Sequence, residues 1–293
     1  VPSAFDAFPD YAGKRGVGVY RRTVDVTPGT SAALKVGGPG MTCDVYIDGE
    51  HAARDIGSCT TFEVHLPPAD TSVQELVFVT DNRYDFSRCP LHENYFDFYN
   101  YGGIIRPVWL EKLPKNALRN AQVTVEDAAA GKIRVTVCFY GERTDFSYSV
   151  DRTACQAVSV SDLSSSETQP STVAFQATVP EPTLWTPDTP VLHTLTIDTG
   201  DDAVTVRFGL REVRAENDRV LINNAPVKLL GYCRHEADPH FGPAVPEHLM
   251  IWDLQRLRDM GCNFIRGVHY QQDPRFLDLC DEMGFLVWSE SLG

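Results

Sequence analysis

The sequence predicts a multidomain, mainly β protein that changes to an α/β pattern near its end. Three observations lead to this prediction. The chain has 293 residues with 43% hydrophobic residues, which is more than one ordinary domain needs. Up to about residue 214, short apolar runs alternate with polar residues at the two-residue period of strands. After that point, strand-like runs alternate with helical patterns, as in an α/β fold.

Residues 1–115 form the first predicted domain, a jelly roll or sandwich of antiparallel strands. Asp48-Gly49 lies between two apolar runs, and this dipeptide is typical of a tight hairpin turn. Repeated short strands without helical periodicity are typical of a sandwich or jelly roll. The predicted strands include Val17–Tyr20, Ala33–Val36, Val45–Ile47, Phe62–Leu66 and Leu76–Val79.

Residues 116–214 form the second predicted domain, which repeats the alternating pattern. Roughly seven strands in about one hundred residues indicate an immunoglobulin-like sandwich. The polar, Ser-rich stretch Ser161–Ser171 is predicted to be a loop between strands, and Asp201-Asp202 a hairpin turn. The predicted strands are Val123–Val125, Ile133–Val137, Phe146–Val150, Val173–Ala177, Leu195–Ile197 and Val204–Phe208.

Residues 215–293 form the third predicted domain, the first three β/α units of a (β/α)₈ barrel, known as a TIM barrel. Pro246 opens a helical pattern that Gly261 closes, and Asp273-Pro274 opens a second that Gly284 closes. Such a barrel needs eight strands and about 250 residues. The three predicted strands are Val227–Leu230, Phe264-Ile265 and Phe285–Trp288.

Composition argues against several classes of partner. A formal net charge of −14 repels the phosphates of nucleic acids and the surface of anionic membranes. No apolar run reaches eighteen residues, and the first residues do not resemble a secretory signal. The eight cysteines are scattered without any CxxC pair, so we expect reduced thiols, no zinc site and a cytoplasmic protein.

Polar side chains follow each of the three predicted barrel strands. Active-site residues of such barrels lie at the carboxyl ends of the strands, so the sequence predicts a pocket at this edge. The candidates are Arg234, His235 and Glu236 after the first strand, Arg266, His269 and Tyr270 after the second, and Ser289 and Glu290 after the third.

Each candidate also has a purely structural interpretation. A histidine at a strand end often braces a loop, and Arg234 and Arg266 can pair with buried carboxylates. For Glu236 we favour a helix N-cap or salt-bridge role. For Glu290 we favour a residue of the barrel floor that holds Arg266 or His269, rather than a catalytic acid.

The stretch Asn94–Gly103 places five aromatic residues around the carboxylate of Asp97 and ends in a pair of glycines that we expect to be flexible. Aromatic faces with a carboxylate suit sugar rings. The alternative interpretation is the edge of a sandwich core, with Asp97 capping a turn. Composition alone supports the two interpretations equally.

At these motifs the chain resembles family 2 glycoside hydrolases of the β-galactosidase and β-glucuronidase kind. Asp97 to Leu110 resembles the signature of the sugar-binding domain of that family. Residues 231–242, GYCRHEADPHFG, and 262–290 resemble the opening strands of its barrel. The order of jelly roll, immunoglobulin-like domain and barrel is also that of the family. Cys233 departs from the usual Asn, and Gly267-Val268 from a small residue and Ser, which leaves the sugar open.

The resemblance implies retaining hydrolysis of terminal β-galactosides or β-glucuronides by two carboxyl groups about 5 Å apart. It implies that Asp97, His235 and His269 contact the sugar and that Arg266 lies beside the nucleophile. An Asn-Glu dipeptide should carry the acid/base, and the chain has none. We therefore expect neither catalytic glutamate in this chain, which we interpret as an N-terminal part of the enzyme that is inactive alone. No cofactor is identified from the sequence. The sequence leaves open whether the full-length enzyme binds a divalent or monovalent metal and whether it forms a homo-oligomer.

Three rival functions remain. A non-catalytic carbohydrate-binding protein would bind sugar without turnover. A structural or adhesive two-sandwich protein would bind no sugar and leaves His235 and His269 unexplained. A metal-dependent barrel hydrolase would use those histidines, but the chain has no His-x-His pair to favour it.

Overall fold

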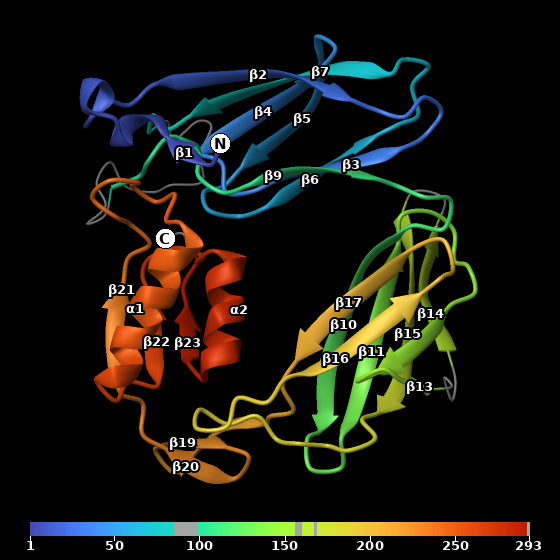
Figure 1. Cartoon of the computed structure of the whole chain (residues 1–293), viewed down its shortest axis with the longest axis vertical. Coiled ribbons are helices and arrows are strands. Elements are labelled where there is room, and N and C mark those ends of the chain that lie inside the picture. Colours follow the sequence, from blue (N-terminus) through green and yellow to red (C-terminus); the bar gives the residue numbers. More distant parts are fainter. Residues whose placement is uncertain (85–98, 156–159, 167–168, 292–293) are drawn as a thin grey trace. The chain divides into compact units, whose positions relative to one another are not determined.

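The computed structural model describes residues 1–84, 99–155, 160–166 and 169–291. The chain divides into two compact units. The first unit contains residues 1–113, 231–279 and 287–293, and the second contains residues 114–230 and 280–286. Strands predominate in both units, so the prediction of a mainly β protein is confirmed (Figure 1).

Two antiparallel sheets form the first β region. Their inward side chains share one core, which includes Leu34, Val45 and Phe78. The turn at Asp48-Gly49 is confirmed, since both residues have positive φ and join a pair of strands. One sheet has the order β2-β7-β4-β5, with β2 at Val17–Asp25, β4 at Thr42–Ile47, β5 at Glu50–Ile56 and β7 at Val73–Asp81. The other has the order β6-β3-β9, with β3 at Ala32–Val36, β6 at Phe62–Leu66 and β9 at Val108–Lys112.

The glycine pair Gly102-Gly103 is closely packed, and the expectation of a flexible pair is wrong. Both residues are buried, and the short strand β8 (Gly103–Ile104) pairs with β1 (Ser3–Ala4). A Cβ at Gly102 would lie 2.3 Å from the ring of Phe5. These glycines therefore allow backbone and aromatic ring to approach, and they do not serve as a hinge.

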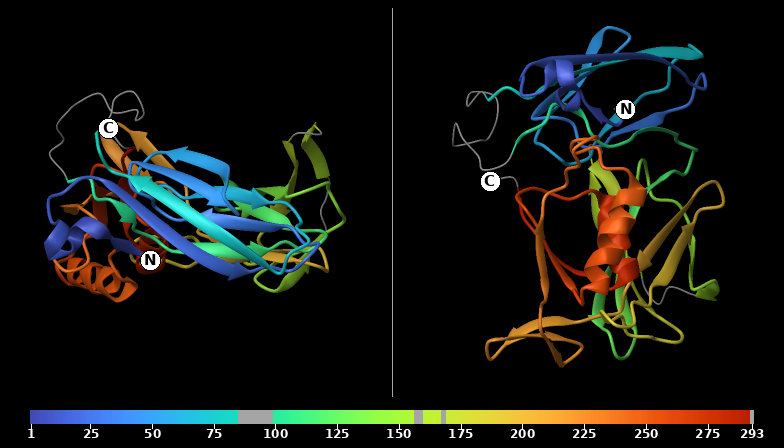
Figure 2. Two further views of the ribbon diagram at one scale, coloured as in Figure 1. Left: turned by 90° about the horizontal axis from the view of Figure 1, so that it is seen from above. Right: turned by 60° about the vertical axis from the view of Figure 1, so that its left-hand side comes forward.

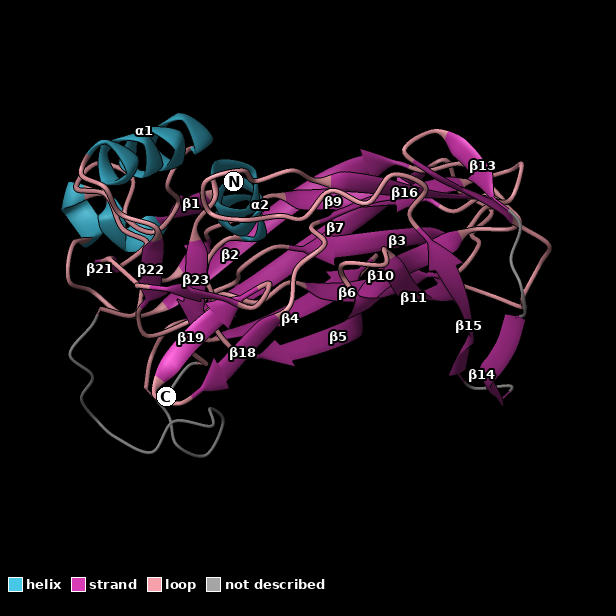
Figure 3. Cartoon of the chain, turned by 90° about the horizontal axis from the view of Figure 1, so that it is seen from below, coloured by secondary structure: helices cyan, strands magenta, loops and turns pink. Residues whose placement is uncertain are grey.

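The second β region is another pair of sheets around a separate core, which includes Val135, Phe139 and Ile197. Figure 3 shows its strands in magenta. One sheet has the order β10-β11-β15-β14, with β10 at Leu118–Asp127, β11 at Lys132–Phe139, β14 at Val160–Ser166 and β15 at Gln169–Thr178. The other has the order β13-β12-β16-β17, with β12 at Ser147–Val150, β13 at Thr153–Cys155, β16 at His193–Asp198 and β17 at Ala203–Phe208.

The predicted loop Ser161–Ser171 is wrong, because most of this stretch belongs to strands β14 and β15. Strand β14 lies at the edge of its sheet, and residues 161–163 are exposed. An edge strand with exposed side chains shows no alternation of apolar and polar residues. Its polar composition is therefore also typical of a loop.

The first strand of the parallel sheet begins later than predicted. Val227 ends β20 (Ala225–Val227), which pairs with β19 (Arg219–Ile222) beside β18 (Val213–Glu216), so Val227–Leu230 is not the first strand of the parallel sheet. That strand is β21 (Gly231–Arg234), parallel to β22 (Phe264–Gly267), and β23 (Leu286–Ser289) follows in the sheet. Leu230 is exposed, so the apolar run did not indicate burial. A Cβ at position 231 would meet the carbonyl oxygen of Phe264, which explains the glycine where pairing begins.

Both predicted helices are confirmed. Helix α1 (Glu247–Asp259) follows Pro246 at the N-cap, and helix α2 (Pro274–Met283) has its proline at the first position. The Asp273 carboxylate accepts the backbone N–H of Arg275 at 2.8 Å, as an N-cap does. Both helices lie on the same side of the β21–β23 sheet (Figures 1 and 2).

The seven cysteines within the described residues are all free thiols, and Cys89 lies outside them. Among the helices that the structure describes, none has the length and apolar character needed to cross a membrane.

Candidate functional site

Glu290 joins two of the predicted site residues at the end of the three-stranded sheet. Its Oε1 lies 2.6 Å from Nε of Arg266, and its Oε2 lies 3.2 Å from Nδ1 of His269. Arg266 is part of strand β22, whereas His269 and Glu290 follow β22 and β23. The hydrogen bond from Arg266 holds the pKa of the Glu290 carboxyl below its usual range. Glu290 thus pairs with both Arg266 and His269, the two residues that we expected a floor residue at this position to hold.

His235 joins the same group from the end of β21. Its ring centroid lies 5.4 Å from that of His269, edge to face, and 6.1 Å from that of Tyr270. The Cys233 sulfur lies 3.9 Å from Nη1 of Arg266. The structure therefore brings together His235, His269, Arg266 and Glu290 as the sequence predicted. Two imidazoles and a guanidinium beside a carboxylate can donate to and accept from the hydroxyl groups of a polar ligand.

Arg234 and Tyr270 support the loops at this edge of the sheet. Arg234 belongs to β21 itself; its Nη1 donates to Oε1 of Gln272 at 3.1 Å, and its Nη2 lies 3.3 Å from the Asp253 carboxylate. Its guanidinium carbon lies 4.1 Å from the ring centroid of Phe276. Tyr270 is buried, and burial raises the pKa of its hydroxyl. Both residues stabilise the loops that carry the histidines.

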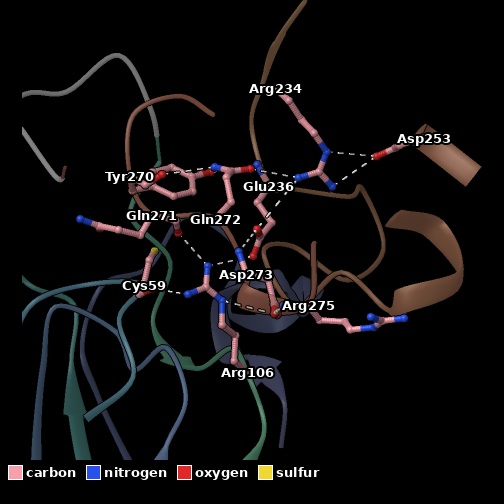
Figure 4. A network of polar contacts seen from close by, with 10 residues as sticks. All are labelled: Cys59, Arg106, Arg234, Glu236, Asp253, Tyr270, Gln271, Gln272, Asp273 and Arg275. Atoms are coloured by element: carbon pink, nitrogen blue, oxygen red, sulfur yellow. Dashed lines mark hydrogen bonds and ion pairs between the residues drawn. The ribbon is translucent and has the colours of Figure 1, made fainter. Parts of the chain in front are cut away.

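Glu236 forms a salt bridge, as we favoured from the sequence, and its partner is Arg106 from the connection between β8 and β9. The two carboxylate oxygens of Glu236 accept from different groups: Oε1 lies 3.1 Å from Nη2 of Arg106, and Oε2 lies 2.7 Å from the backbone N of Asp273. Burial raises the pKa of Glu236, and the Arg106 guanidinium opposes that rise. Figure 4 shows these contacts.

Arg106 has no predicted role, although its place in the sequence carries a signal. The arginine stands in the apolar run Ile104-Ile105-Arg106-Pro107-Val108, where a charged residue must be paired if the run is buried. This local pattern does not indicate the partner of Arg106, because Glu236 is 130 positions away in the chain.

Asp97 lies outside the described residues, so its predicted contact with sugar stays a prediction. The segment that follows it is anchored by Asp6, a buried carboxylate that sequence reasoning missed. Asp6 accepts the backbone N–H of Gly102 at 3.1 Å and the side-chain amide of Asn82 at 3.0 Å. Desolvation raises the pKa of Asp6. Nothing in the surrounding sequence marked Asp6 as buried.

Within the part of the chain that the structure describes, no group of three His, Cys, Asp or Glu side chains could hold a metal ion.

Curated relatives of this chain have two kinds of name. A putative β-glucuronidase from Formosa agariphila is 29% identical over 264 residues, which cover 86% of this chain and 32% of that protein. A β-galactosidase from Thermoanaerobacter pseudethanolicus is 26% identical over 317 residues, covering all of this chain and 42% of that protein. The chain thus spans less than half the length of these two relatives.

Solved structures agree with these relatives. A GH2 β-galacturonidase from Eisenbergiella tayi matches with a TM-score of 0.86 and 29% identity, covering all of this chain and 53% of that one. A β-glucuronidase from Faecalibacterium prausnitzii matches with a TM-score of 0.82 and 26% identity, covering all of this chain and 54% of that one.

Two family models match successive parts of the chain. The model described as "Glycosyl hydrolases family 2" matches residues 105–211, and the model described as "Glycosyl hydrolases family 2, TIM barrel domain" matches residues 213–292. The resemblance noted in the sequence is thereby confirmed: the chain belongs to glycosyl hydrolase family 2.

Proposed function

We propose that the protein containing this chain hydrolyses terminal β-glycosides with retention of configuration, and that this chain supplies residues that bind the terminal sugar. The observation that carries the proposal is the cluster of His235, His269, Arg266 and Glu290 at the end of the three-stranded sheet. Ligands of α/β barrels bind at this edge of the strands.

In this proposal His235 and His269 line the subsite for the terminal sugar, and Asp97 contacts the sugar from the first domain. Arg266 lies beside the nucleophilic carboxylate of the complete site, and Glu290 orients Arg266 and His269. The salt bridge at 2.6 Å supports this role, because a carboxylate already engaged by a guanidinium and an imidazole is held in one position.

The domain arrangement is part of the same proposal. Residues 1–115 form a sugar-binding jelly roll, residues 116–214 an immunoglobulin-like sandwich, and residues 215–293 the start of the catalytic barrel. No Asn-Glu dipeptide occurs in the 293 residues. We place the acid/base and the nucleophile in later barrel strands, outside this sequence, so these 293 residues alone should not turn over substrate.

Galactosides, glucuronides and galacturonides are the substrates to test, because relatives and solved structures are named for enzymes of these three kinds. These sugars differ at C4 and C6, so one series of aryl β-glycosides distinguishes them. We further propose a cytoplasmic location, which the free thiols of the described cysteines support.

The experiment compares the 293-residue chain with the full-length protein that contains it, on the three aryl β-glycosides and their α-anomers. We expect turnover of one β-glycoside by the full-length protein only, and a large loss of kcat/KM in His269→Gln. His51→Gln is the matched control, because His51 also lies 2.9 Å from a carboxylate, that of Asp44 in the first β region. This variant should keep full activity.

Two results would contradict the proposal. Sugar binding without hydrolysis by the full-length protein would favour the carbohydrate-binding alternative. Turnover by the 293 residues alone that disappears in Glu290→Gln would make Glu290 a catalytic carboxylate.

A further inference from the structure

Arg106 lies at the centre of a buried network that reaches both candidate histidines through their neighbours in the chain. His235 directly precedes Glu236, which binds the Arg106 guanidinium. His269 directly precedes Tyr270 and Gln271, and the carbonyl oxygen of Gln271 accepts from Nη2 of Arg106 at 2.8 Å. One side chain from the first β region therefore binds a group within two residues of each histidine.

The guanidinium of Arg106 joins three separate segments. Its Nη1 donates to the carbonyl oxygen of Cys59, its Nη2 to Glu236 and Gln271, and its Nε lies 3.5 Å from Oδ2 of Asp273. Only 3% of the Arg106 side chain and 1% of the Glu236 side chain are exposed. A planar fork of five N–H donors can serve several acceptors at once, which a lysine ammonium at the same place cannot do with the same geometry.

The two loops are also tied to each other next to this guanidinium. The backbone N–H of Glu236 donates to the hydroxyl of Tyr270 at 3.2 Å. The backbone N–H of Asp273 donates to the Glu236 carboxylate at 2.7 Å. Figure 4 shows Glu236, Gln271 and Asp273 converging on Arg106. If Arg106 is removed, the Glu236 carboxylate is left buried without its main counter-charge, and the loops must move to hydrate it.

We infer that Arg106 is a positioning residue, which fixes His235 and His269 in their mutual edge-to-face arrangement beside Glu290 without contacting the substrate. This inference deepens the proposed function and rests on it for its meaning, but the positioning itself can be measured in the chain alone. Together with the two direct hydrogen bonds between the loops, the buried Arg106 guanidinium fixes the distance between the loop after β21 and the loop after β22.

The test follows the histidine rings by NMR in the 293-residue chain with labelled histidine. The chain has only eight histidines, so the spectrum is simple. His235→Gln and His269→Gln assign the two rings. In the unaltered chain we expect NOEs between the rings, whose centroids lie 5.4 Å apart. In Arg106→Lys, which keeps the charge but not the fork, we expect these NOEs to disappear and both ring shifts to change.

Two further variants separate positioning from stability. Leu34→Ala creates a cavity in the first β region, where Leu34 is fully buried, and should lower Tm while leaving both rings unchanged. The double variant Arg106→Gln/Glu236→Gln removes both buried charges, so it should fold even where Arg106→Gln alone does not. Its rings should still be displaced, because the Arg106 guanidinium no longer joins the two loops to the first β region.

Unchanged rings in both Arg106→Lys and the double variant would overturn the inference, and so would equal ring changes in Leu34→Ala. Failure of the proposed function would give a different result. In that case the rings move in the Arg106 variants, but the full-length protein hydrolyses no β-glycoside. If that protein is active, Arg106→Lys should raise KM or lower kcat at least tenfold at a temperature where the variant is folded.

Discussion

Phe276 is a buried side chain that supports the candidate site through Arg234. It lies on α2, none of it is exposed, and its ring supports the guanidinium of Arg234 at 4.1 Å. Removing a buried phenylalanine costs about 3–5 kcal/mol through the cavity it leaves. The lost cation–π contact adds roughly 0.5–2 kcal/mol. Against a net domain stability of about 5–15 kcal/mol, Phe276→Ala should remove roughly a quarter or more.

Hydrogen exchange shows where this loss falls. Even in the unaltered chain we expect faster exchange in β22 than in β17, because the three-stranded sheet exposes large apolar side chains, Tyr232 at 58% and Trp288 at 61%. Phe276→Ala should accelerate exchange further in β22 and leave β17 unchanged.

Phe139→Ala is the matched control, because Phe139 is equally buried in the core of the second β region. It should cost a similar free energy of unfolding and affect β17 instead. A loss below about 1 kcal/mol in Phe276→Ala would refute the reasoning, since a collapsible or poorly packed site is the only way to avoid the cavity cost. Equal protection of β22 and β17 in the unaltered chain would show that the three-unit sheet folds well by itself.

Two further predictions concern single positions. The pKa of Glu290 lies below the unfolded value of about 4.5, so its ion pair contributes stability above that pH, which is lost as the pH falls through the lower folded pKa. Arg266→Gln should therefore raise the carboxyl pKa of Glu290 towards 4.5 in a ¹³C titration, and an unchanged titration would show that the pair is not formed. Gly231→Ala should cost about 1–3 kcal/mol or more in urea denaturation, because the new Cβ would lie 1.6 Å from the carbonyl oxygen of Phe264. Gly16→Ala, where no atom lies within 4 Å, should cost little, and equal losses in both variants would contradict the clash.

Local patterns in the sequence determined the elements themselves. Alternating apolar residues located most strands of both β regions, and proline, aspartate and glycine signals located both helices to within one or two residues. The barrel motifs placed His235, His269 and Glu290 at the ends of strands, and the structure brings them together. These features could be predicted because periodicity, caps and turns depend on residues close together in the chain.

The tertiary structure alone decided where long-range partners lie. Arg106 and Glu236 are distant in sequence, and each looks like an ordinary charged residue until packing buries both. The roles of Asp6 and the Gly102-Gly103 pair also depend on the tertiary structure. Only the packed structure shows that these residues anchor the segment after Asp97 and do not make it flexible. Burial is a property of the whole fold, so the residues that must pair because they are buried cannot be recognised from their local sequence.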